Sequence, residues 1–326
     1  IPRSDIMANS MFESTYAACQ EITKTFDMVW ALDAGLWNLR RDAQKYYAEH
    51  PDATEEEVKD NLVQGLTIHG LNPKQIAIEL SWEYEEQYIA KLLLINATAI
   101  FDTWVDTFVE ATISKNVLQQ IIYPKRAHKK PYTLGDKIKA DFKAGFFDTY
   151  VKQLKAEQKS TLSGSFEFTA ERQDNYIENL RLTYKYFKSC RNCCAHGDVN
   201  FTAATEKSYN AIKALTKTDC GLKEFPKIEP TVQGNPFKLY LRGVVGFYDI
   251  LIRIINHFDL FAADYIAVEK ELLKRWSQIP NVKLSANSEK RNRSIRNYII
   301  SVNMCPPYSN KTDDVFLFLK GMKIVK

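Results

Sequence analysis

Residues 177–198 read IENLRLTYKYFKSCRNCCAHGD, and this stretch decides how the rest of the chain is interpreted. Four apolar side chains in it are spaced alternately three and four residues apart, which places them on one buried face of a helix: Ile177, Leu180, Tyr184 and Phe187. The next position in this register is Arg191. A guanidinium on a buried face is costly unless it is paired or lines a cleft or an interface. We therefore expect a core helix with a functional end.

The end of this helix combines a cation with a group that exchanges protons. His196 follows Arg191 by five residues, which is about 140° around a regular helix. Gly197 can take the left-handed conformation that ends a helix, and the turn would let the imidazole fold back towards the guanidinium. Imidazole titrates near neutral pH, whereas arginine stays charged and can hold a phosphate by paired hydrogen bonds. The pair therefore fits chemistry on a phosphodiester.

Residues 191–197, RNCCAHG, resemble the signature of the HEPN superfamily: an Arg followed by a polar residue, then a His, at the end of a core helix in an all-α bundle. The resemblance implies a ribonuclease that needs neither a metal ion nor another cofactor. Two protomers would bring their Arg and His side chains into one cleft, so we expect a homodimer with a composite active site. We also expect RNA as the substrate and an antitoxin or regulatory protein as a further partner.

Carried onto this chain, the resemblance assigns a role to each of three residues. His196 would act as general acid or base at the ribose 2′-hydroxyl or the leaving oxygen, and Arg191 would stabilise charge on the phosphate. Asn192 would position the motif by hydrogen bonding. Many relatives are toxins or antiphage defence effectors. In relatives that a nucleotidyltransferase regulates, a Tyr two positions after the His is modified; here that residue is Asp198, which argues against such regulation.

Three other interpretations of the motif remain open. A zinc ion could use Cys190, Cys193, Cys194 and His196, but four ligands within seven helical residues would have to converge on one tetrahedron. Arg191 could instead form a salt bridge at an interface, and His196 could interact favourably with the helix dipole. A non-catalytic helical module that binds RNA, a nucleotide or a protein is the main alternative to the nuclease.

Charge is distributed unevenly along the chain. The formal net charge is +4, but residues 274–326 hold 11 Lys and Arg against three acidic residues. These basic residues and a mid-chain cluster could meet RNA phosphates; the candidate RNA-binding residues are Lys125, Arg126, Lys129, Lys130, Arg291, Arg293 and Arg296. Asn96 and Asp102 interrupt an apolar helix, and they are candidates for orienting Arg191 or His196.

Helical patterns predict a mostly α protein with three parts. Residues 1–72 form an N-terminal helical segment, residues 73–276 an antiparallel HEPN-like bundle with an excursion at 123–170, and residues 277–326 a small basic α+β appendage.

The elements follow from capping and breaking residues. The predicted helices cover 11–47, 54 onwards behind a Thr54–Glu57 capping box, 73–122 with a break near Trp82, 169–194, 202–215, 236–276 and the basic SEKRNRSIRNYIISV segment. The VFLFL segment at 315–319 is predicted as a strand.

The location of the protein follows from its cysteines and apolar runs. The six cysteines show no disulfide framework, and the apolar runs are interrupted or shorter than the ~20 residues that cross a bilayer. We expect a soluble protein of the reducing cytoplasm with no membrane partner.

Overall fold

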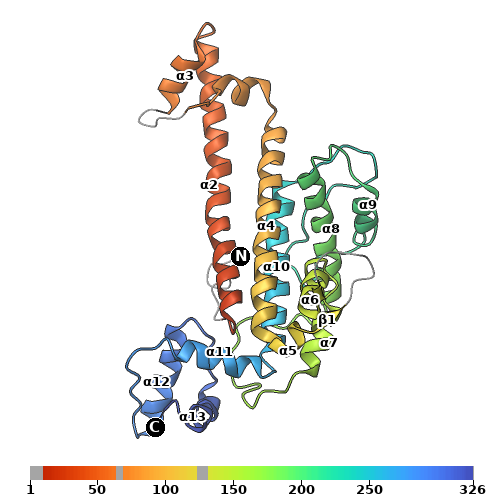
Figure 1. Ribbon diagram of the computed structural model, residues 1–326. Coiled ribbons are helices and arrows are strands. Elements are labelled where there is room, and N and C mark those ends of the chain that lie inside the picture. Colours follow the sequence, from red (N-terminus) through yellow and green to blue (C-terminus); the bar gives the residue numbers. More distant parts are fainter. Residues whose placement is uncertain (1–9, 64–68, 123–130, 326) are drawn as a thin grey trace.

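The computed structural model describes residues 10–63, 69–122 and 131–325. Within these ranges the protein is mostly helical, as predicted (Figure 1). The one sheet there has two strands, β1 (Ile121–Ile122) and β2 (Tyr132–Thr133), which pair antiparallel. The fold is therefore set by helix packing.

Four long helices build the centre of the molecule: α2 (Glu13–Glu49), α4 (Trp82–Thr112), α8 (Ile177–His196) and α10 (Leu241–Ala262). Helix α4 lies against the other three, and α10 packs on both α2 and α8. Contacts between distant residues show that α2 and α8 run one way and α4 and α10 the other. One continuous hydrophobic core joins all four helices.

Helix α4 is long and apolar enough to cross a bilayer by length and composition alone. Its most apolar window is 44% buried inside the protein. Trp104 and Phe101 are fully buried there, and the indole N–H of Trp104 donates to Thr15 of α2 at 3.1 Å. These contacts are those of a core helix.

At one end α2 and α4 extend past the bundle and carry a small second cluster. It joins α2 to α3 (Glu55–Leu62) and to a π-helical turn, η1 (Gln75–Glu79). The predicted capping box of Thr54 and Glu57 is present. The predicted break near Trp82 is also present, but α4 ends at Thr112, ten residues earlier than expected.

The segment after α4 contributes to the core. It holds α5 (Lys115–Leu118), the two strands, α6 (Leu134–Lys143) and α7 (Asp148–Ala156). Five of its side chains are buried in the main core: Ile138, Phe142, Phe147, Tyr150 and Leu154. The predicted excursion between core helices is therefore also a packed layer.

Two long helices predicted from periodicity are shorter in the structure. Helix α8 begins at Ile177 rather than near Thr169, because turns occupy the preceding residues. The predicted helix at 236–276 is divided by a turn into α10 and α11 (Ala267–Trp276). Between α8 and α10 lies α9 (Ala203–Asn210), which Thr202 caps as predicted but which ends before Leu215.

The prediction of a strand in the C-terminal appendage is wrong. The appendage consists of α12 (Ser288–Ser301), a 3₁₀ turn η2 (Ser309–Lys311) and α13 (Thr312–Gly321), which contains the whole VFLFL segment. Val315 and Leu319, four residues apart, are the two residues of this segment that are fully buried. This spacing fits one face of a helix, although a short apolar run of this kind also fits a strand. The described appendage is therefore α only.

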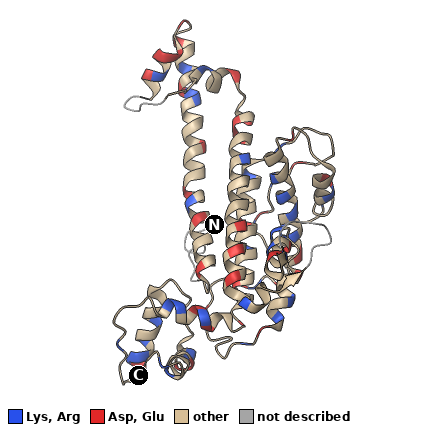
Figure 2. Ribbon diagram, in the orientation of Figure 1, with Lys and Arg blue, Asp and Glu red and all other residues tan. Residues whose placement is uncertain are grey.

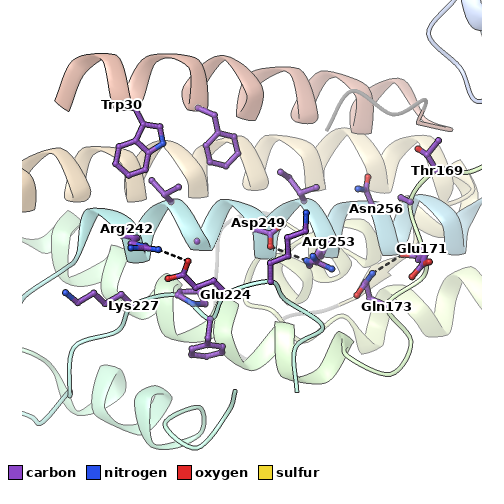
Figure 3. A pocket seen from close by; sticks show the side chains of 18 residues that line it. Trp30, Thr169, Glu171, Gln173, Glu224, Lys227, Arg242, Asp249, Arg253 and Asn256 are labelled. Atoms are coloured by element: carbon purple, nitrogen blue, oxygen red, sulfur yellow. Dashed lines mark hydrogen bonds and ion pairs between the residues drawn. The ribbon is translucent and has the colours of Figure 1, made fainter. Parts of the chain in front are cut away.

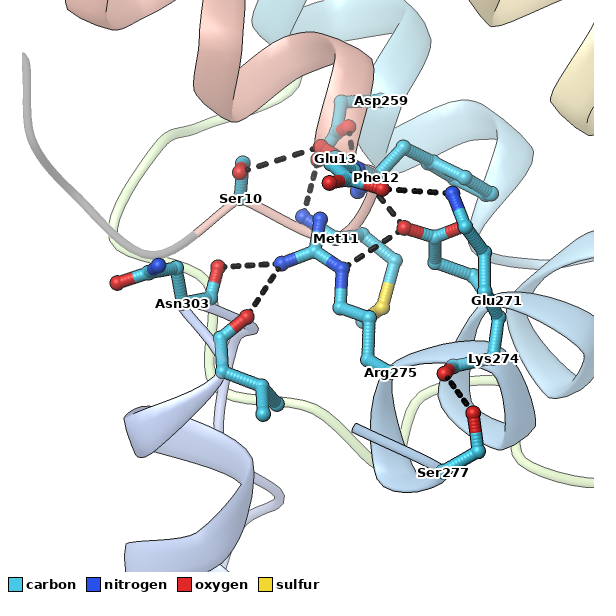
Figure 4. Close-up of polar contacts among 11 residues, drawn as sticks. Ser10, Met11, Phe12, Glu13, Asp259, Glu271, Lys274, Arg275, Ser277 and Asn303 are labelled. Carbon is cyan, nitrogen blue, oxygen red and sulfur yellow. Dashed lines mark hydrogen bonds and ion pairs between the residues drawn. The ribbon is translucent and has the colours of Figure 1, made fainter. Parts of the chain in front are cut away.

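A buried polar network ties the start of α2 to the end of α10 and to the appendage (Figure 4). Asp259 accepts the N–H groups of Met11 at 2.7 Å and Phe12 at 3.1 Å. Glu271 accepts from the Arg275 guanidinium at 2.8 Å, and Arg275 also donates to two carbonyls that follow α12. We call Asp259, Glu271 and Arg275 the polar latch.

Candidate functional site

The left-handed turn at Gly197 ends helix α8 as predicted, although the helix runs to His196, two residues past the predicted end near Cys194. Gly197 has φ 70°, which is left-handed, and its N–H reaches the carbonyls of Cys193 and Cys194. The N–H of Asp198 donates to the Cys193 carbonyl at 2.9 Å, which completes a helix-ending turn. The end of α8 is thus fixed by backbone geometry.

The turn comes too late to fold His196 back onto Arg191. The helix stays regular through His196, so the two residues lie about 140° apart around its axis. No hydrogen bond or ion pair joins them within residues 177–198, all of which the structure describes. The turn at Gly197 alone therefore does not place both side chains on one phosphate.

Arg191 and His196 sit in different surroundings. Arg191 is half-buried, its Nη1 donates to Asn192 at 3.3 Å, and its Nε is buried with no partner. His196 and Asn192 are exposed. A buried donor without an acceptor is unfavourable, so the Arg191 guanidinium gains from a ligand oxygen beside it.

His196 shares its face of α8 with residues that line a basic groove. Asn192, Lys188 and Lys185 precede it by four, eight and eleven residues, which keeps all four on one side of the helix. The groove is about 440 Å³ in volume, and Asn192, both lysines, Lys143 and Ser208 are among its lining residues. Figure 2 shows the basic residues of α8 in blue.

The sequence interpretation missed these lysines. Lys188 pairs with Asp102 of α4 at 3.0 Å, and the Lys185 ammonium lies 4.0 Å from the centre of the Phe146 ring. Burial is the main cause that lowers the pKa of Lys185, followed by the charge of Arg181. The spacing of three, then four, from Lys185 to Asn192 was the signal that could have found the groove.

The two residues expected to orient the motif are engaged elsewhere. Asp102 is the partner of Lys188, and Asn96 accepts a hydrogen bond from Tyr248 of α10 at 3.1 Å. Among the described contacts, neither residue reaches Arg191 or His196. Asp102 still acts on the site indirectly, because it holds one of the groove lysines.

The cysteines of the motif pack into the core. Cys190 and Cys193 are buried, and the Cys193 sulfur lies 3.3 Å from the Thr205 hydroxyl of α9. Burial raises the pKa of Cys190, and it raises that of Cys194 to about 11. Among the described residues, no group of three or more His, Cys, Asp or Glu side chains could hold a metal ion.

The predicted RNA-binding cations fall into two groups. Lys125, Arg126, Lys129 and Lys130 lie outside the described residues.

The C-terminal arginines are mostly committed to structure. Arg291 pairs with Asp313 at 2.8 Å and stacks on Phe316, and Arg296 pairs with Glu167 at 2.8 Å. Only Arg293 of these three is exposed. Two of the three thus hold the appendage together.

No protein-family profile, curated protein or solved structure matches this chain. The function must therefore be inferred from the residues of α8 and their surroundings.

Proposed function

We propose that the protein is a metal-independent endoribonuclease of the HEPN type, acting as a toxin or antiphage defence effector. The observation that carries the proposal is the end of α8, where an exposed His196 follows Asn192 and two lysines along one face of a core helix. The groove would hold the RNA backbone, since clustered lysines bind phosphates.

The proposed reaction is transesterification at phosphorus. A neutral His196 imidazole takes the proton of the ribose 2′-hydroxyl, and that oxygen attacks the adjacent phosphorus. The bond from phosphorus to the 5′-oxygen breaks, and the leaving oxygen takes a proton from the imidazolium that the first step forms. The products are a 2′,3′-cyclic phosphate and a 5′-hydroxyl. Arg191 stabilises the charge on the non-bridging oxygens.

The angle between Arg191 and His196 favours a site made by two copies of the chain. One helix presents the two groups in directions about 140° apart, so one copy presents only one of them squarely to a given phosphate. In a two-fold dimer, Arg191 of one copy can face His196 of the other, and the same arrangement then occurs twice.

Cleavage of total RNA in EDTA tests the proposal directly. The wild-type protein should yield fragments with 2′,3′-cyclic phosphate ends. His196→Ala and Arg191→Ala should each lower the rate by about 10² to 10⁴, the range for loss of a general acid–base group or of electrostatic stabilisation, with unchanged circular dichroism. Full activity in His196→Ala would remove the assigned role.

Mixing the two variants tests the composite site. If each site takes Arg191 from one copy and His196 from the other, a mixed dimer has one intact site and one doubly damaged site. Random exchange then restores about a quarter of the wild-type rate, because about half of the dimers are mixed. No recovery after verified exchange would place both groups of each site in one copy.

A non-catalytic RNA-binding module is the second candidate. The basic groove and the half-buried position of Arg191 favour it. It predicts salt-sensitive RNA binding without any cleaved ends. The same incubation with total RNA distinguishes the two functions.

A further inference from the structure

A second cavity, of about 550 Å³, lies between α2, α10 and two loops (Figure 3). Its floor is one face of α10 from Arg242 to Asn256, and its walls are residues 169–173 and 223–227 together with two side chains of α2. It shares no lining residue with the α8 groove. Its volume falls in the range of roughly 300–1,000 Å³ that is usual for small-molecule sites.

One end of this cavity is aromatic. Phe26 and Trp30 are four residues apart on α2, so they share the side that faces α10. Phe26 packs on Tyr248, with ring centres 5.6 Å apart. Trp30 is 49% exposed, and Figure 3 shows its indole over the floor near Arg242. An indole face left open to a cavity can stack on a planar ring.

The other end has polar groups that lack partners. Gln173 is only 8% exposed, and its Nε2 donates to the Glu171 carbonyl, but its Oε1 has no partner. Arg253 uses its Nε for Asp249 at 3.3 Å, and no described residue takes a hydrogen bond from its terminal nitrogens. Asn256 makes no side-chain hydrogen bond to the described residues either. Of these groups only Gln173 Oε1 is buried, and a buried polar atom normally has a partner, so a ligand hydroxyl would supply one here; Arg253 and Asn256 are half-buried and keep free donors beside it.

Two glycines hold the cavity wall in place. A Cβ at Gly243 would lie 2.0 Å from the Lys227 carbonyl oxygen, and one at Gly246 would lie 3.2 Å from Pro226. The loop therefore rests directly on the α10 backbone, where a larger side chain would push it away. The wall is formed before any ligand arrives.

The charge of the lining suits a ligand with few negative charges. The seven charged side chains are four cations and three carboxylates, which leaves one net positive charge: Arg242, Arg253, Lys223, Lys227, Glu171, Glu224 and Asp249. A phosphate monoester, which carries about one and a half to two negative charges near neutral pH, comes nearer to this balance than a polyphosphate, whose further charges would meet the carboxylates without compensation.

We propose that this cavity binds a nucleoside monophosphate. The base stacks against Trp30 and Phe26, the phosphate accepts from the terminal nitrogens of Arg253, and a ribose hydroxyl donates to Gln173 Oε1.

The cavity lies one helix away from the proposed nuclease site. The opposite side of α10 packs on α8 through Phe247 and Phe187, whose rings stack with centres 4.6 Å apart. Binding in the cavity is nevertheless independent of the proposed function, because none of its residues belongs to the motif. Its test can therefore fail or succeed without the nuclease.

Calorimetry with adenosine 5′-monophosphate (AMP) tests the site on the whole 326-residue chain. AMP should bind at least about tenfold more tightly than adenosine, which lacks the phosphate, and than ribose 5-phosphate, which lacks the base. Arg253→Gln should weaken AMP binding about tenfold or more. Arg41→Gln removes an exposed guanidinium of α2 outside the cavity and should bind as the wild type does.

Three results would overturn the proposal. One is the absence of AMP binding up to millimolar concentration, and another is equal binding by Arg253→Gln. The third is ribose 5-phosphate binding as tightly as AMP, since the aromatic end would then have no role. If Arg253→Gln does not fold, Arg253→Lys serves as the test. Lysine keeps the charge but lacks the paired donors of arginine, so this variant should also bind AMP more weakly. His196→Ala should bind AMP normally whatever its effect on RNA.

Discussion

Two arginines of this protein show how the same side chain serves different ends. Arg275 is 2% exposed in the polar latch, pairs with Glu271 at 2.8 Å and donates to two backbone carbonyls. Arg191 is half-buried at the end of α8 and makes a single long hydrogen bond to its neighbour. The first guanidinium makes three hydrogen bonds within the fold and leaves only its Nη2 without a partner, whereas the second makes one hydrogen bond and no ion pair.

The largest difference should appear in stability. Arg275→Ala leaves Glu271 buried without its partner, so it should lower the free energy of unfolding by about 3–5 kcal/mol. Arg191→Ala should cost no more than about 1 kcal/mol, because it removes no ion pair. Urea denaturation of both variants measures the comparison, and equal losses would mean that Arg191 is also structural.

The latch should also respond to pH. Burial raises the pKa of Asp259 to about 6, against the lowering effect of its hydrogen bonds. The folded protein therefore holds this proton more tightly than the unfolded chain does, so its stabilising effect is present at low pH and is lost as the pH rises through 6.

Relative to Asp259→Asn, the wild type should thus gain about 1 kcal/mol of unfolding free energy between pH 7 and pH 5. Parallel denaturation curves at the two pH values measure this gain. A constant difference would show that the two N–H donors keep the carboxylate ionised.

The turn that ends α8 should contribute less. Gly197→Ala places a Cβ in open space but at φ 70°, so its cost is backbone strain of about 1 kcal/mol. Gly35→Ala, at a helical position of α2 with equal space, should be neutral or stabilising. A comparison of the two melting temperatures separates the effect of conformation from that of the added methyl group.

The smallest effect should come from a single groove lysine. Lys185→Gln should weaken RNA binding a few-fold and reduce the slope of log affinity against log salt by about 1. Arg293→Gln, in the appendage, tests the same charge at the predicted C-terminal site. If only the appendage variant changes the salt slope, the RNA path does not follow α8.

The helical class, the capping box and the turn at Gly197 could be predicted from the sequence, because each depends on neighbouring residues. The helical form of residues 315–319 could not be predicted in this way. A short apolar run fits a strand or a helix, and its packing against α12 is a contact between elements. The pairing of Asp102 with Lys188 joins residues 86 positions apart, beyond the reach of local patterns. The direction of the His196 side chain depended on whether the helix ended near Cys194, as predicted, or at His196, two residues later.

The polar latch also affects how the chain folds during its synthesis. Asp259 accepts the N–H of Met11 across 248 positions of sequence, so α2 emerges from the ribosome long before the residue that anchors its start is made. Until then its apolar side, which includes the buried Ile22 and Val29, has no complete partner surface. We expect the nascent chain to rely on chaperones through this interval, and a fragment that stops before α10 to aggregate.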